Sequence, residues 1–98
     1  MKKFDRAALE KLFSAMLLLE NEEECENFLN DICTVQELEA LAQRFDVACK
    51  LSSGKVYSEI SAETGASPAT VSRVNRCIKY GNGGYKTVID RLGDKAND

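Results

Sequence analysis

The residues best suited to binding a ligand are basic, and they lie together in the second half of the chain. Between Glu63 and Asp90 the sequence contains no acidic side chain. The same interval holds the basic side chains Arg73, Arg76, Lys79 and Lys86. Lysine and arginine without neighbouring carboxylates favour contact with phosphate groups. The interval therefore predicts a phosphate-facing surface, and solvated basic side chains that bind nothing are the alternative.

This basic interval contrasts with the rest of the chain, because the formal net charge of the protein is -3. Residues 1–50 carry 6 basic and 11 acidic side chains, whereas residues 51–98 carry 7 and 5. The halves thus differ in sign, which agrees with an anion-binding surface confined to the second half.

Enzymatic chemistry has little support in the sequence. The chain has no histidine, which removes Ser-His-Asp and Cys-His nucleophiles and the commonest general base. Its cysteines, at positions 25, 33, 49 and 77, lack the C-x-x-C spacing of zinc sites. We therefore predict a protein that is not an enzyme, with no metal site, whose reduced cysteines pack as small apolar residues.

The sequence also bears on localisation. No apolar run approaches the ~20 residues that a membrane span requires. The start, M-K-K-F-D-R-A, lacks the apolar core and cleavage site of a secretory signal. We expect a cytoplasmic protein without a membrane partner.

The helical segments suggest a single domain with three parts, since 98 residues are about one domain's worth of chain. We assign residues 1–54 to dimerisation helices and residues 56–80 to a helix-turn-helix. Residues 81–98 are expected to form a turn, a short helix over residues 85–92 and a fraying tail. In that short helix Val88, Ile89 and Leu92 are expected to pack inward. No segment has strand periodicity, so the predicted fold class is all-α.

Three amphipathic helices are predicted before Gly54, over residues 5–19, 22–33 and 34–52. Their expected caps are Asp5, Asn21 and Thr34, the last in a capping box with Glu37. The expected buried stripe of the third helix is Leu38, Leu41, Ala42, Phe45, Ala48 and Cys49. Together the three helices present more apolar face than a small globule needs, which favours a homodimer over a monomeric three-helix bundle.

Residues 56–80 have the pattern of a helix-turn-helix. Ser58 is predicted to cap a first helix that Gly65 ends, because glycine adopts a positive φ at little cost. Ser67 is predicted to cap the second helix, with Pro68 at its first position. The side chains expected to point inward are Ile60, Ala66, Val71, Val74 and Ile78.

The opposite surface of the second helix suits the major groove of DNA. The candidate DNA-binding residues are Ser67, Pro68, Ala69, Thr70, Ser72, Arg73, Arg76 and Lys79. Small residues allow close approach, Ser72 can bond base edges, and arginine can bond guanine or phosphate. Lys79 is assigned to phosphate. A helical protein–protein adaptor on the same scaffold, without DNA binding, is the alternative.

The chain resembles the tryptophan repressor family, and more closely its YerC/YecD-like branch, over roughly residues 5–92. The match is carried by T-V-Q-E-L-E-A-L-A-Q-R (34–44), by residues 58–79 and by Y-G-N-G-G-Y-K (80–86). The resemblance implies an intertwined, all-helical homodimer that presents two helix-turn-helices to a palindromic operator. The expected function is transcription regulation, as a repressor of a biosynthetic operon.

The same resemblance implies an effector site. In the family a bound amino acid acts as corepressor between two arginines, and Arg44 and Arg73 match both positions. Thr34 matches another residue of that pocket. Val74 stands where the family has glycine and Cys77 where it has serine, and both changes disfavour tryptophan. We expect a different effector, or none. If there is one, the resemblance points to an amino acid or its biosynthetic intermediate, with histidine worth testing alongside tryptophan.

Overall fold

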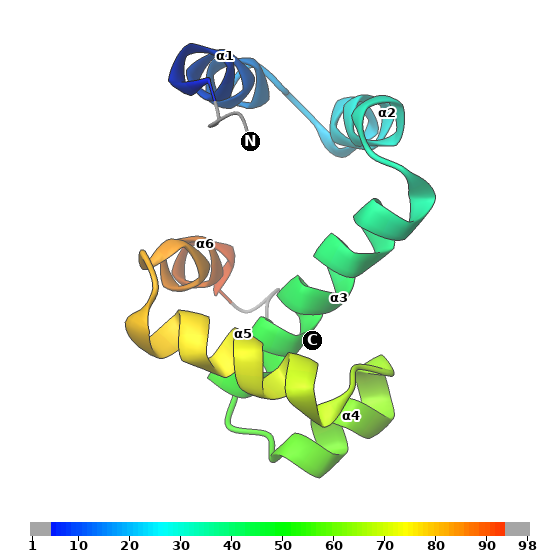
Figure 1. The fold of residues 1–98 in the computed structure, drawn as a ribbon, viewed down its shortest axis with the longest axis vertical. Coiled ribbons are helices and arrows are strands. Elements are labelled where there is room, and N and C mark those ends of the chain that lie inside the picture. The colour runs from blue at the N-terminus through cyan, green and yellow to red at the C-terminus, as the bar shows by residue number, and fades with distance from the viewer. Residues whose placement is uncertain (1–4, 94–98) are drawn as a thin grey trace. The chain divides into compact units, whose positions relative to one another are not determined.

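The computed structural model describes residues 5–93, and within that range the secondary structure is entirely helical. The helices in chain order are α1 (Arg6–Met16), α2 (Glu22–Ile32), α3 (Val35–Ser52), α4 (Tyr57–Thr64), α5 (Pro68–Tyr80) and α6 (Gly84–Leu92) (Figure 1). The all-α prediction is confirmed. Most of the tail predicted over residues 93–98 lies outside the described residues.

The chain divides into two compact units between Val35 and Gln36. The N-terminal unit contains α1 and α2, and the C-terminal unit contains α3 after its first residue together with α4, α5 and α6. No helix of the described chain is long and apolar enough to cross a membrane.

The caps predicted for α1 and α2 are confirmed. The Asp5 carboxylate accepts a hydrogen bond from the Ala7 amide at 3.0 Å. The Asn21 side chain accepts from the Glu24 amide at 2.9 Å, and the Glu24 carboxylate accepts in turn from the Glu20 amide at 2.9 Å. The bonds from the Ala7 and Glu24 amides satisfy donors that a helix start leaves without an intrahelical partner.

Helix α1 ends earlier than the predicted Leu19. After Met16 the amides of Leu18 and Leu19 bond carbonyls three residues back, at 3.0 and 3.2 Å, so the chain tightens into turns instead of continuing the helix. The apolar run L-L-L at residues 17–19 matched the helical period but has no residue that signals this stop.

The N-terminal unit buries none of its described helical residues. Leu17 is 86% exposed and Phe13 is 47% exposed. Leu9, Leu12, Phe28 and Leu29 are half-buried. The apolar stripes of α1 and α2 therefore remain largely open within a single chain.

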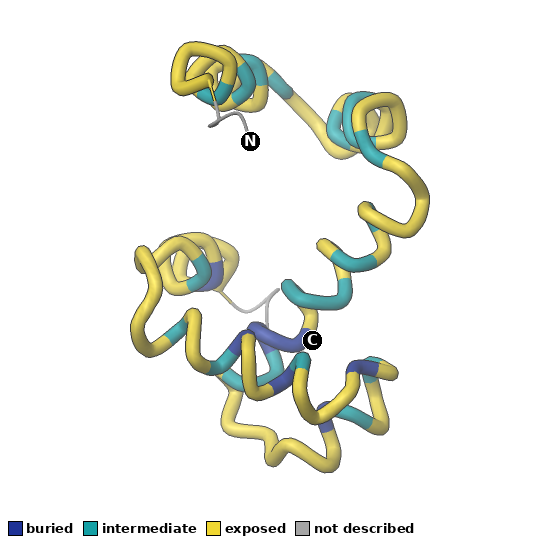
Figure 2. The backbone as a smooth tube through the Cα atoms, in the orientation of Figure 1, coloured by how far each residue is buried: buried dark blue, intermediate teal, exposed yellow. Residues whose placement is uncertain are grey.

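The core of the protein lies where α3, α4, α5 and α6 meet (Figure 2). Its buried residues are Val47, Ala48, Cys49, Ile60, Ala66, Val71, Val74 and Ile89. Burial also raises the pKa of the Cys49 thiol, which keeps it neutral and suits its role as a small apolar core residue. This core fixes the helix-turn-helix against the end of α3.

Two details of the predicted core are wrong. In α3 the buried residues are Val47 to Cys49, whereas Leu41 is 45% exposed and Ala42 is exposed, because only the C-terminal end of α3 is covered. In α6 only Ile89 is buried, while Val88 and Leu92 remain exposed. A helix of nine residues packed on one neighbour buries a narrow stripe, so its flanking apolar residues face outward.

Candidate nucleic-acid interface

The first helix of the helix-turn-helix begins without a side-chain cap. Val56 precedes α4 with extended backbone, and its carbonyl accepts from the Ile60 amide at 3.1 Å. Ser58 is the second residue of α4, so its prediction as the cap is wrong. Serine at the second helical position and serine at the cap produce the same local sequence signal, and the packing of Ile60 in the core sets the register.

The end of α4 agrees with the prediction. Gly65 has φ 76°, in the left-handed region that glycine adopts at low cost, and its amide bonds the Ser61 carbonyl at 2.9 Å. Thr64 organises the turn: its hydroxyl donates to the Ile60 carbonyl at 2.7 Å and accepts from the Ala66 amide at 3.1 Å. The buried Ala66 then leads into the second helix.

The start of α5 is also as predicted. The Ser67 hydroxyl accepts from the Thr70 amide at 3.1 Å, and Pro68 occupies the first turn. The Ser67 hydroxyl further donates to the Thr70 hydroxyl at 3.1 Å. Two of the candidate DNA-binding residues thus have a local structural role that holds the N-terminus of α5.

The remaining side chains of α5 separate into two faces. Val71 and Val74 are buried and Ile78 is half-buried, all facing the core. The exposed candidates form what we term the α5 strip, which consists of Ser67, Pro68, Ala69, Ser72, Arg73, Arg76 and Lys79. Thr70 is half-buried. The hydrophobic period of residues 68–80 was sufficient to predict this separation.

Charge on the α5 strip is not neutralised within the described chain. None of the ion pairs in residues 5–93 involves Arg73, Arg76 or Lys79. Lys86 differs, because its ammonium lies 3.0 Å from the Asp90 carboxylate one turn along α6. Among the four basic residues of the acid-free interval, the three on α5 are therefore the ones free to meet an external anion.

A pocket of about 280 Å³ lies beside the strip. It is lined by Ala40, Gln43 and Arg44 of α3, by Thr70, Arg73, Val74 and Cys77 of α5, and by Tyr85 of α6. Four candidate effector residues, Arg44, Arg73, Val74 and Cys77, thus come together from two helices. Thr34 is not among the lining residues.

The pocket has the chemistry of an anion site. It contains two guanidinium groups and no carboxylate among its lining residues. Val74, nearly fully buried, contributes an apolar wall, and Gln43, Thr70 and Tyr85 add polar groups. Sequence reasoning missed two lining residues, Gln43 and Tyr85. Gln43 directly precedes Arg44 in the sequence. Tyr85 could not be found because no spacing signal connects α6 to α3.

Helices α4 and α5 are joined by a tight turn and pack on an all-α core, and α5 is capped and positively charged. These features define a helix-turn-helix protein. The chain also matches the Trp repressor protein family over residues 7–93. It belongs to that family of DNA-binding regulators, as the resemblance in its sequence indicated.

Individual relatives support the same assignment. YerC, an uncharacterized protein of Bacillus subtilis strain 168, is 49% identical over 84 residues, which cover 86% of this chain and 81% of YerC. A candidate Trp repressor from Staphylococcus aureus has a crystal structure similar to this one, with 48% identity, a TM-score of 0.86 and coverage of 90% and 88% of the two chains. A TrpR-like protein from Eubacterium eligens ATCC 27750 gives 48% identity, a TM-score of 0.87 and coverage of 90% and 91%.

Proposed function

We propose that this protein is a homodimeric, sequence-specific transcription regulator that represses a biosynthetic operon by binding a palindromic operator. The observation that carries the proposal is the α5 strip, exposed and free of ion pairs within the described residues, on a helix whose other face is locked into the core. A rigid helix with small and basic side chains on its free face fits the major groove.

Each part of the strip has a role in this proposal. Ala69 and Ser72 are small enough to let α5 approach the base edges, and the Ser72 hydroxyl donates or accepts a hydrogen bond there. Arg73 and Arg76 bond guanine or phosphate. Lys79 lies nearer the C-terminal end of the helix and contacts phosphate without reading sequence.

A second copy supplies the dyad symmetry of the operator. The exposed apolar side chains of α1 and α2, which include Phe13 and Leu17, are the surface that this copy covers. In a dimer that follows the general geometry, the two α5 helices lie about 34–36 Å apart, one turn of DNA.

The pocket beside α5 is the proposed effector site. Two guanidinium groups favour the carboxylate of an amino acid or related metabolite, which acts as corepressor by bracing α5 against α3. The family uses tryptophan in this role. Val74 lines the pocket where the family has glycine, so its larger side chain reduces the space open to an indole ring. Histidine is therefore worth testing alongside tryptophan.

Selection of binding sites from random duplexes tests DNA recognition. Enrichment of a palindrome at low salt is expected, and absence of any enriched sequence, with or without added metabolites, contradicts the proposal. A purified protein that ignores duplex DNA but captures a protein partner would instead indicate an adaptor.

Two variants distinguish residues that recognise bases from residues that contact phosphate. Lys79→Ala should weaken binding to all duplexes equally and reduce the slope of log K against log salt by about 1.8, since the dimer loses one phosphate contact in each subunit. Ser72→Ala should change the preferred bases and leave that slope unchanged. Lys11→Ala, in α1, is the matched control and should change neither property. A changed base preference in Lys79→Ala would contradict its phosphate role.

A thermal-shift series over the amino acids tests the effector. A ligand that binds only the folded protein raises the Tm, by an amount that grows with its concentration. The Arg44→Met variant should lose the shift. Uniformly flat results at millimolar concentrations exclude an amino-acid corepressor.

A further inference from the structure

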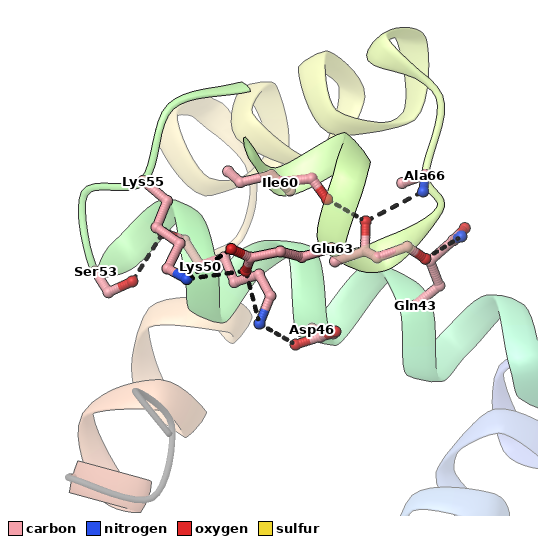
Figure 3. A network of polar contacts seen from close by, with 9 residues as sticks. Gln43, Asp46, Lys50, Ser53, Lys55, Ile60, Glu63 and Ala66 are labelled. Carbon is pink, nitrogen blue, oxygen red and sulfur yellow. Dashed lines mark hydrogen bonds and ion pairs between the residues drawn. The ribbon is translucent and has the colours of Figure 1, made fainter. Parts of the chain in front are cut away.

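Gln43 connects α3 directly to the backbone of the helix-turn-helix. Its side-chain amide Nε2 donates to the Thr64 carbonyl at 3.2 Å, across 21 residues of sequence and in a partly buried setting (Figure 3). The carbonyls at the end of a helix have no intrahelical partner. Gln43 therefore satisfies one of the orphan groups of α4 at the point where the chain turns toward α5.

The contact lies at the centre of the turn. The hydroxyl and the carbonyl of Thr64 together take part in three hydrogen bonds, to Ile60, Ala66 and Gln43. A Cβ added to the adjacent Gly65 would lie 3.9 Å from Gln43 Nε2, which places the amide in van der Waals range of the turn. A shift of Gln43 must therefore move this turn or break the bond.

Helix α4 is also held by ion pairs, which differ in kind from the Gln43 hydrogen bond. Glu63 pairs with Lys55 at 2.9 Å and with Lys50 at 3.6 Å (Figure 3). These are ion pairs between partly exposed, flexible side chains, which tolerate movement and contribute little each. Gln43 instead binds the main chain itself, so it constrains the path of the turn more directly.

We infer that Gln43 is a positioning residue for DNA recognition: by holding the Thr64 carbonyl it sets the angle at which α5 leaves the turn. This inference rests on the proposed function of α5. Gln43 also lines the pocket with Arg44, Thr70 and Arg73, so it is in contact with both the effector site and the turn.

Gln43→Met tests this role, because methionine keeps the length and packing of the side chain and removes the donor. In the full-length protein, the Kd for the selected duplex should rise roughly 10- to 100-fold, because the dimer loses this hydrogen bond in both subunits. Gln43→Glu, which turns an acceptor toward the carbonyl, should have a larger effect. Gln36→Met, exposed on the same helix, is the control and should bind as the wild type does.

A purely stabilising role predicts a different result. In that case Gln43→Met would lower the Tm and the fraction of active protein. The Kd of the folded protein and its preference for the selected over a random duplex would not change. If Gln43 positions α5, the variant should show a lower preference for the selected duplex even at temperatures well below its Tm. Amide hydrogen exchange at Gly65 and Ala66 should also be faster.

The outcomes separate the two proposals. If the wild type selects no duplex, both the proposed function and the role of Gln43 fail. If the wild type binds and Gln43→Met binds with the same Kd and preference, only the role of Gln43 fails. Weaker DNA binding with unchanged exchange at Gly65 and Ala66 also overturns it, because the turn would not be the link.

Discussion

Both the N-terminal and the C-terminal unit contain amphipathic helices, yet only the C-terminal unit forms a buried core. Helices α3 to α6 share a buried core, whereas α1 and α2 bury no residue. Val71 and Val74 are buried within the chain, whereas Phe13 and Met16 are exposed and Leu9 is only half-buried. Amphipathicity shows that a face must be covered without specifying whether the same chain covers it.

The largest effect is expected in the core. Ile60→Ala removes a fully buried side chain and should lower the free energy of unfolding by about 2–5 kcal/mol. Chemical denaturation measures the loss, and Glu59→Ala, exposed on the same helix, should stay within about 0.5 kcal/mol of the wild type. A loss at Ile60 as small as that of the control would mean that this core is not the source of stability.

The next effect concerns the open N-terminal face. Phe13→Glu places a charge in the expected dimer contact and should raise the dimer Kd at least about 10-fold by sedimentation equilibrium. Ser14→Glu, on the adjacent polar side of α1, is the matched control. Equal dimer constants for the two variants, or a monomeric wild type, would show that no second copy covers Phe13.

A smaller effect is expected at the helix caps, one in each unit. Ser67→Ala and Asn21→Ala each remove an oxygen that accepts a main-chain N–H, and each should cost about 1 kcal/mol in thermal or chemical unfolding. Only Ser67→Ala should also weaken DNA binding, since it frees the start of α5. Reduced DNA binding in Asn21→Ala, at protein concentrations that keep the dimer intact, would contradict this division of roles.

The smallest effect is the pH dependence of the Lys55–Glu63 pair. The hydrogen bond from Lys55 lowers the pKa of Glu63, so this contribution is present above the ordinary carboxyl range and is lost as the pH falls through the lowered value. The same bond raises the pKa of Lys55, so its share is present below the ordinary lysine range and is lost as the pH rises through the raised value. Stability from the pair is therefore greatest near neutral pH.

Glu63→Gln checks this dependence. As the pH falls from roughly 7 to 3 and Glu63 becomes protonated, the Tm of the wild type should decrease slightly more than the Tm of the variant. The difference is small because both side chains are exposed to solvent. Identical pH profiles would mean that the pair contributes nothing to folding.

Local sequence signals predicted much of the fold. Asp5, Asn21 and Ser67 cap their helices because a side-chain oxygen within three residues of a free amide needs no distant partner. Gly65 ends α4 for a similarly local reason, its freedom to adopt positive φ. The two faces of α5 followed from residue spacing alone.

Other features depended on which helices meet. Residue spacing could not show that Val47 enters the core while Leu41 stays exposed, because the answer depends on where α4 and α5 cross α3. Nor could it show that α4 begins before Ser58. The partly buried bond from Gln43 to Thr64 joins residues too far apart in sequence for a periodic pattern to connect.

The amino-acid order thus specified the all-helical class, the caps of α1, α2 and α5 and the polar face of α5, since these depend on interactions within one or two turns of chain. The pocket, the anchoring of the turn and the limits of the core were decided by packing between helices, because burial is a property of a surface together with its neighbours.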